Sequence, residues 1–178
     1  MLPGANRDSC RYATLAGDSQ KRVSSTLRIP TTVKPMQIYT RQLRVRHYEI
    51  DVLGHVNNAV YQNYLEQAAV EHAQLLGYSL AQCRKLGGVF VMRRIEIDYL
   101  RPAIADDTLE ITTWLQQMKG TRAIRRYEIH RLAQVQPLVI AEAIWVWVDL
   151  VTMRPQGIPK EILTGFEPIQ PDNKLSNT

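Results

Sequence analysis

The feature that most constrains the fold is a single long amphipathic segment, which is followed by four long runs of β-type sequence. Side chains of one face recur at the 3.6-residue spacing of a helix: Tyr61, Tyr64, Leu65, Ala68, Ala69, His72, Leu75 and Leu76. Gln and Glu dominate the opposite face, and Gly77 follows as a typical helix terminator. The spacing predicts one helix of about five turns, roughly 27 Å long.

Four later runs have the length and residue types of β-strands: Val89–Leu100, Thr108–Met118, Thr121–Arg131 and Leu138–Val151. Short polar turns separate the last three runs, which favours an antiparallel meander. The final run is apolar on both faces, so we expect it to lie centrally in the sheet.

Two further elements precede these runs. Apolar and charged residues alternate from Gln37 to about Ile50, with Val45 and His47 on the apolar side, and this predicts a half-buried strand. Ser79 is placed to cap a short second helix. One strand, one long helix and four antiparallel strands predict an α+β fold, in which a curved sheet wraps around a single central helix.

The chain divides by composition into three parts. Residues 1–36 contain one aromatic side chain and no regular apolar period, so we expect a flexible basic extension. Residues 37–167 carry the pattern of one domain, and residues 168–178 form a short tail. Three interpretations of this extension stay open: a simple flexible segment, an organelle transit segment, or sequence upstream of a true start at Met36.

The charge and cysteine content narrow the class of protein. The net charge is +5, but residues 37–178 hold 16 basic and 15 acidic side chains, so we expect no nucleic-acid partner for the domain. No run approaches the ~18 apolar residues of a membrane-spanning helix. Cys10 and Cys83 are too few for a disulfide framework and indicate a reducing compartment. We therefore expect the cytoplasm, or an organelle such as the plastid if the extension is a transit segment.

The polar residues cluster where the first strand gives way to the long helix. The common nucleophile, nucleotide-binding and metal-enzyme motifs are absent, and we expect neither a metal nor an organic cofactor. Asp51 lies a few residues before a helix start near Asn58, whose N–H groups suit a developing oxyanion. A carboxylate and a helix N-terminus suffice to hydrolyse a thioester, because its carbonyl is activated and its thiolate leaves easily.

A longer pattern contains these residues: Val45-Arg-x-Tyr48-x-x-Asp51-Val-x-x-His55-Val-Asn57-Asn58-Ala-x-Tyr61-x-x-x-Leu65-Glu66-x-Ala68, with Tyr99-x-Arg101-Pro102 downstream. It resembles the hotdog-fold acyl-CoA thioesterases of the 4-hydroxybenzoyl-CoA thioesterase-like superfamily, nearest the long-chain acyl-CoA thioesterase III type. The resemblance implies a hotdog fold and hydrolysis of fatty acyl-CoA to free acid and CoA.

The resemblance also implies roles for individual residues. Asp51 matches the catalytic carboxylate, acting as nucleophile or as general base, and the backbone N–H of Asn58 matches the group that polarises the thioester carbonyl. Glu66 matches an acidic helix position of these enzymes. His55 fits the related plant acyl-ACP thioesterases, but Leu53 replaces the Asn of their motif, so acyl-CoA is the favoured substrate.

Six residues are assigned to substrate binding: Asn57, Tyr61, Tyr64, Phe90, Lys119 and Arg122. Tyr64 and Phe90 are candidate walls for the acyl chain. Lys119 and Arg122, with the nearby Arg125 and Arg126, are candidates for the CoA phosphates, although charged residues at solvated strand edges are the simpler interpretation.

Simpler structural roles compete with several assignments. Asp51 can serve as an acceptor within a turn, Asn57 and Asn58 favour helix capping, and His55 can orient the loop. Glu66 points away from the apolar stripe, towards solvent or another subunit. His72, in the middle of the apolar face, is expected to be a core histidine.

The resemblance implies a homodimer or homotetramer in which sheets pair edge to edge. One helix against five strands leaves little interior volume, so we expect an acyl chain to run along a subunit boundary. Three alternatives remain: an acyl-ACP thioesterase, a hotdog dehydratase or hydratase that uses His55 with Glu66, and a non-catalytic acyl-CoA binding module.

Overall fold

The computed structural model describes residues 37–166. The predicted N-terminal extension and the predicted C-terminal tail lie outside these residues. So do the predictions that the extension is a transit segment or lies upstream of a true start. The elements are β1 (Ile38–Arg44), a 3₁₀ turn η1 (His47–Glu49), α1 (Asn58–Leu75), α2 (Leu80–Lys85), β2 (Gly88–Tyr99), β3 (Thr108–Lys119), β4 (Arg122–Arg131), β5 (Pro137–Asp149) and α3 (Lys160–Gly165).

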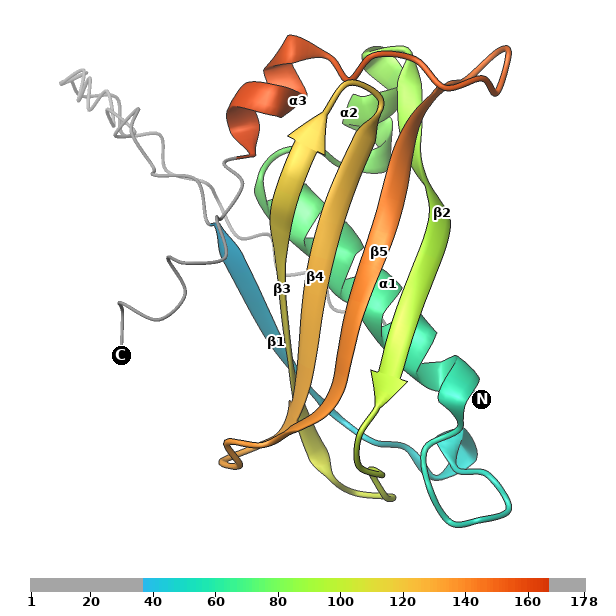
Figure 1. Cartoon of the computed structure of the whole chain (residues 1–178), viewed down its shortest axis with the longest axis vertical. Helices are drawn as coiled ribbons and strands as arrows, with labels where there is room; N and C mark the ends of the chain where they lie inside the picture. Colours follow the sequence, from blue (N-terminus) through green and yellow to red (C-terminus); the bar gives the residue numbers. More distant parts are fainter. Residues whose placement is uncertain (1–36, 167–178) are drawn as a thin grey trace, which may run out of the picture. The chain divides into compact units, whose positions relative to one another are not determined.

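The five strands form one antiparallel sheet in the order β1-β3-β4-β5-β2, and α1 lies along one of its faces (Figure 1). The predicted meander is therefore correct, and β5 is an interior strand as expected, although β4 holds the middle position. β1 and β2 are the two edges. This is the predicted α+β architecture of a curved sheet around one long helix.

The long helix forms where its periodicity predicts. Asn57 caps it, since its side-chain oxygen accepts a 2.9 Å hydrogen bond from the Ala59 N–H. The buried face packs against the sheet within the main core cluster. Leu75, which the sequence assigns to this face, is exposed near the helix end.

The predicted end of the first strand was wrong, and α3 was not predicted from the sequence. β1 ends at Arg44, and η1 replaces its expected continuation. The Arg46 N–H donates to the Glu49 carboxylate at 2.8 Å instead of to a neighbouring strand. His47 consequently lies on an exposed turn rather than on the apolar side of a strand.

Two hollows lie near opposite ends of α1. One, of about 240 Å³, borders Asn58 and Tyr61; the other, of about 160 Å³, borders Ala69 and Gln74. The second hollow is bordered by residues of α1, α2 and the sheet. No helix among residues 37–166 has the length and apolar character needed to cross a membrane.

Candidate active site

Asp51 lies in a tight turn between η1 and α1. Its carboxylate Oδ1 accepts hydrogen bonds from the Leu53 N–H at 2.8 Å and, more weakly, from the His55 N–H at 3.4 Å. The Asp51 N–H donates to the His55 carbonyl at 2.8 Å, and Gly54 supplies the positive φ that the turn requires. Within residues 37–166, no donor is bonded to Oδ2. The turn role and a chemical role are thus compatible, because each uses a different oxygen.

The buried carboxylate of Glu49 holds this turn in place. Glu49 is 6% exposed and accepts a 2.6 Å hydrogen bond from the Tyr64 hydroxyl, besides its two bonds from Arg46. Burial acts to raise the pKa of Glu49, but the hydrogen bonds from Tyr64 and Arg46 outweigh it and lower the pKa below its ordinary value. The Asn57 N–H also donates to the Glu49 carbonyl at 2.9 Å. Glu49 therefore joins the turn, the helix start and the core.

The first turn of α1 presents its N–H groups beside Asp51. Asn57 uses its side chain to cap Ala59, and within the described residues nothing accepts from the Asn58 N–H. The Tyr99 hydroxyl donates to the Asn58 carbonyl at 3.0 Å, which ties the helix start to the end of β2. The Tyr61 hydroxyl accepts from the Ala103 N–H at 3.1 Å and fixes the next loop.

These segments enclose the 240 Å³ pocket. Four of the predicted site residues line it, namely Asp51, His55, Asn58 and Tyr61. The downstream motif supplies the opposite wall through Tyr99, Leu100, Arg101 and Pro102. The pocket therefore combines a carboxylate, a helix N-terminus and an apolar rim. That combination can polarise a carbonyl and direct water or a carboxylate oxygen onto it.

The remaining predicted residues do not line this pocket. Asn57 is the helix cap, Tyr64 is buried in the core, and Glu66 is exposed two turns along α1. Tyr64 is therefore not an acyl-chain wall of the Asp51 pocket. It supports the pocket indirectly through Glu49.

Phe90, Lys119 and Arg122 lie towards the other end of the sheet. Lys119 and Arg122 flank the β3–β4 hairpin, at the far end from the loop that follows β1 (Figure 1). The strand rise puts Lys119 roughly 37 Å from Thr108, beside which β1 ends. A single chain does not bring these cations to the Asp51 pocket.

Arg125 contradicts both of its sequence interpretations. It is neither a solvated strand-edge residue nor a surface cation, because it is only 5% exposed. Its guanidinium contacts His72, which is a buried core histidine as predicted. The alternating burial of β4 points Arg125 towards the helix and Arg126 away from it.

Comparisons with known proteins identify the family of the chain. The family model of the acyl-ACP thioesterase N-terminal domain matches residues 36–166. The chain belongs to this thioesterase family. The long-chain acyl-CoA thioesterase FadM of Escherichia coli is 34% identical over 129 residues, covering 71% of this chain and 95% of FadM. The chloroplastic acyl-acyl carrier protein thioesterase ATL3 of Arabidopsis thaliana is 28% identical over 162 residues, covering 83% of each chain.

A solved structure supports the same assignment. The probable thioesterase YbaW of Escherichia coli is 32% identical, has a TM-score of 0.63, and covers 71% of this chain and 95% of YbaW. The resemblance to hotdog thioesterases, the hotdog fold and the activity of a thioester hydrolase are thereby confirmed. This thioesterase is an enzyme rather than a non-catalytic binding module.

Proposed function

We propose that this thioesterase hydrolyses fatty acyl-CoA to free fatty acid and CoA, with Asp51 as its catalytic residue. The observation that carries the proposal is the shared pocket of Asp51 and the Asn58 N–H. Oδ1 is engaged in the turn while Oδ2 has no donor among the described residues. A reacting carbonyl between the two groups meets a carboxylate and an oxyanion donor together.

In the general-base route, Asp51 takes a proton from water as the water oxygen attacks the thioester carbon. The Asn58 N–H donates to the carbonyl oxygen as negative charge develops there. Collapse of the intermediate then breaks the C–S bond and expels the CoA thiolate. In the nucleophilic route, an Asp51 oxygen attacks the thioester carbon, and the C–S bond breaks to expel the CoA thiolate and leave a mixed anhydride. Water then hydrolyses the anhydride to the free fatty acid and the Asp51 carboxylate.

His55 and Tyr99 are proposed to position these groups. His55 provides a backbone N–H to Asp51 and a carbonyl to the Asp51 N–H. Tyr99 holds the Asn58 carbonyl and lines the pocket. Glu66 is proposed to assist only across a subunit boundary, since it is exposed and does not border the pocket in its own chain.

Acyl carrier protein (ACP) is a second candidate for the group that carries the acyl chain. Acyl-ACP is favoured by the name of the family model and by the chloroplastic relative. Acyl-CoA is favoured by FadM and by Leu53, which offers no polar group where the acyl-ACP motif has Asn. Thiol release from a panel of acyl-CoA esters, with matched acyl-ACP esters as competitors, decides between them. Faster turnover of acyl-ACP at equal concentration overturns the acyl-CoA proposal.

The active form is proposed to be a homodimer or homotetramer paired through the β2 edge. β2 is paired only with β5 within the described chain, and it ends at Tyr99, next to the pocket. A second chain along that edge runs past the pocket and offers walls for an acyl chain. Free edges invite such pairing.

We propose the cytoplasm as its compartment, with an organelle as the alternative if residues 1–36 direct import. Cys83, the cysteine among the described residues, is a free thiol. Fractionation of cells expressing the full chain tests the choice.

A further inference from the structure

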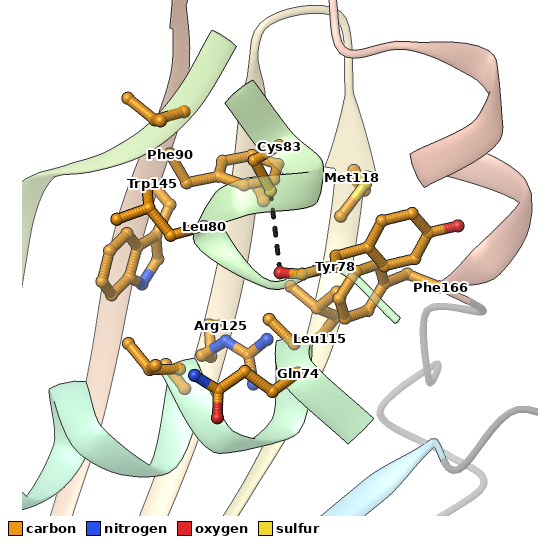
Figure 2. Close-up of a pocket in the computed structure, with 15 residues that line it drawn as sticks. Gln74, Tyr78, Leu80, Cys83, Phe90, Leu115, Met118, Arg125, Trp145 and Phe166 are labelled. Atoms are coloured by element: carbon orange, nitrogen blue, oxygen red, sulfur yellow. Dashed lines mark hydrogen bonds between the residues drawn. The ribbon is translucent and has the colours of Figure 1, made fainter. Parts of the chain in front are cut away.

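The second cavity lies far from Asp51, at the other end of α1. It has a volume of about 160 Å³ and is bounded by α1, α2, the sheet and Phe166 (Figure 2). Its walls are mainly apolar, and Leu80, Phe90 and Trp145 are among them. Ala69 begins its lining 11 residues after Asn58, or roughly 16 Å along the helix. The cavity is therefore separate from the Asp51 pocket.

A charged side chain lies against this apolar space. Arg125 is 5% exposed, and Figure 2 draws its guanidinium beside Gln74 in the cavity lining. Its Nη1 donates to Thr113 Oγ1 at 3.1 Å and lies 2.9 Å from His72 Nδ1. Because a guanidinium can only donate, His72 Nδ1 is the acceptor and its proton is on Nε2.

No carboxylate within residues 37–166 pairs with Arg125. The neighbouring Tyr127 does not supply a negative charge, because burial raises its pKa to about 12. Arg126, the next residue along β4, is instead paired with Glu142 at 2.6 Å and bonded to Gln116 at 2.7 Å. A buried charge is costly without a partner of opposite sign. Arg125 therefore differs from Arg126, because Arg125 is buried and has no carboxylate partner among the described residues.

The free donors of Arg125 have a specific geometry. Nε and Nη2 make no hydrogen bond to any described residue, and they form one edge of the planar guanidinium. That edge presents two parallel N–H groups, which match the two oxygens of a carboxylate. Val70 and Leu80, both lining residues, are exposed to solvent and give access to the cavity.

We propose that this cavity binds a small apolar carboxylate, with its carboxylate on the Nε and Nη2 edge of Arg125 and its tail among the apolar walls. An apolar cavity of about 150 Å³ is known to hold benzene, so a tail of roughly six carbons is accommodated. Short aliphatic and aromatic acids belong to this class. The free acid released by thioester hydrolysis has the same chemistry, but the site does not depend on which thioester is the substrate.

Calorimetric titration of the full chain with octanoate tests the proposal, with octanamide as the uncharged control. We expect octanoate to bind at least about tenfold more tightly than octanamide, because hydrogen bonds to charged groups are the stronger ones. Arg125→Met should abolish this preference, while Arg126→Met, which alters the adjacent outward-facing arginine, should retain it. Ala73→Leu, which fills the cavity and leaves Arg125 unchanged, should weaken octanoate binding.

Three results overturn the proposal. They are failure of octanoate to bind the unaltered chain, equal affinity for octanoate and octanamide, and unchanged octanoate binding in a folded Arg125→Met protein. Titration of Asp51→Asn separates the two pockets: loss of octanoate binding there, with retention in Arg125→Met, assigns the acid to the Asp51 pocket. That outcome rejects the second site and leaves the proposed thioesterase reaction untouched.

Discussion

The Tyr64 hydroxyl donates a 2.6 Å hydrogen bond to the buried carboxylate of Glu49, 15 residues earlier in the chain. This bond joins the middle of α1 to the turn that carries Asp51. Glu49 also accepts hydrogen bonds from the Arg46 N–H and from the Arg46 guanidinium, and these bonds stabilise its ionised form. The position of the turn that carries the proposed catalytic residue Asp51 therefore depends on the ionised carboxylate of Glu49.

The first prediction follows from the lowered pKa of Glu49. Tyr64→Phe removes one of the hydrogen bonds that lower this pKa, and should cost about 1.5–3 kcal/mol of unfolding free energy at neutral pH. A carboxyl with a lowered pKa stabilises the fold above its unfolded pKa, and that stabilisation is lost as pH falls through the folded value. The difference between Tyr64→Phe and the unaltered chain should therefore shrink as the pH falls below the ordinary pKa of a glutamate and through the lowered pKa of Glu49.

Urea unfolding at several pH values measures this difference. Tyr127→Phe is the matched control, because Tyr127 is also buried but its hydroxyl accepts from Trp145 rather than bonding a carboxylate. A pH-independent loss of stability in Tyr64→Phe would contradict the assigned role of Glu49.

The second prediction concerns the proposed catalytic carboxylate. Asp51→Asn keeps an oxygen to accept the Leu53 N–H, so the turn should persist while the carboxylate is lost. We expect kcat to fall by about 10²-fold or more with little change in unfolding temperature. Asp149→Asn is the control, since Asp149 accepts from Val151 and Thr152 in a similar turn outside the pocket. Near-normal turnover by folded Asp51→Asn removes Asp51 from the mechanism.

A companion variant distinguishes the two chemical routes. Asp51→Glu retains the carboxylate but displaces it by one methylene. Activation of water tolerates such a displacement better than direct attack does, because direct attack requires the carboxylate oxygen itself to reach the carbonyl. Substantial residual kcat supports the general-base route, and loss as complete as in Asp51→Asn supports nucleophilic attack.

The third prediction separates capping from catalysis at the start of α1. Asn57→Ala removes the acceptor of the Ala59 N–H and should cost about 1 kcal/mol of unfolding free energy. Asn57→Asp should retain most of that stability. Asn58→Ala preserves the Asn58 backbone N–H, so we expect its kcat to stay close to that of the unaltered chain. A large fall in kcat for Asn58→Ala would instead assign catalysis to its side chain.

Sequence periodicity was sufficient for most of the fold because it extends over long segments. The helix that contains Tyr61 and Leu65 and the long β-runs repeat their pattern often enough to define an element and its buried face. The first strand was extended too far because Val45 and His47 continue an alternating pattern. The backbone leaves the sheet there because Arg46 bonds to Glu49, a contact that residue spacing does not report.

The site was predicted in part for a similar reason. Asp51, His55 and Asn58 are close in sequence, so a local motif was enough to bring them into one pocket. Glu49 was missed, although its position three residues after Arg46 is the spacing of a capping interaction. Arg125 was misread because a charged residue in a strand is usually exposed, and only the register of β4 shows that it faces α1.

The last prediction tests the proposed β2 interface with two matched edge residues. Val91 on β2 is 41% exposed and Ile38 on β1 is 40% exposed, so each offers a similar apolar surface at opposite edges of the sheet. In a two-fold interface any residue occurs twice. Val91→Asp therefore brings two like charges into a shared boundary, whereas Ile38→Asp adds a charge to an edge outside it.

Sedimentation over a dilution series should show Val91→Asp dissociating at higher protein concentration than the unaltered chain, with activity falling in parallel. Ile38→Asp should retain the original assembly and activity. Dissociation by Ile38→Asp alone would move the interface to β1, and a fully active monomer would refute the requirement for assembly.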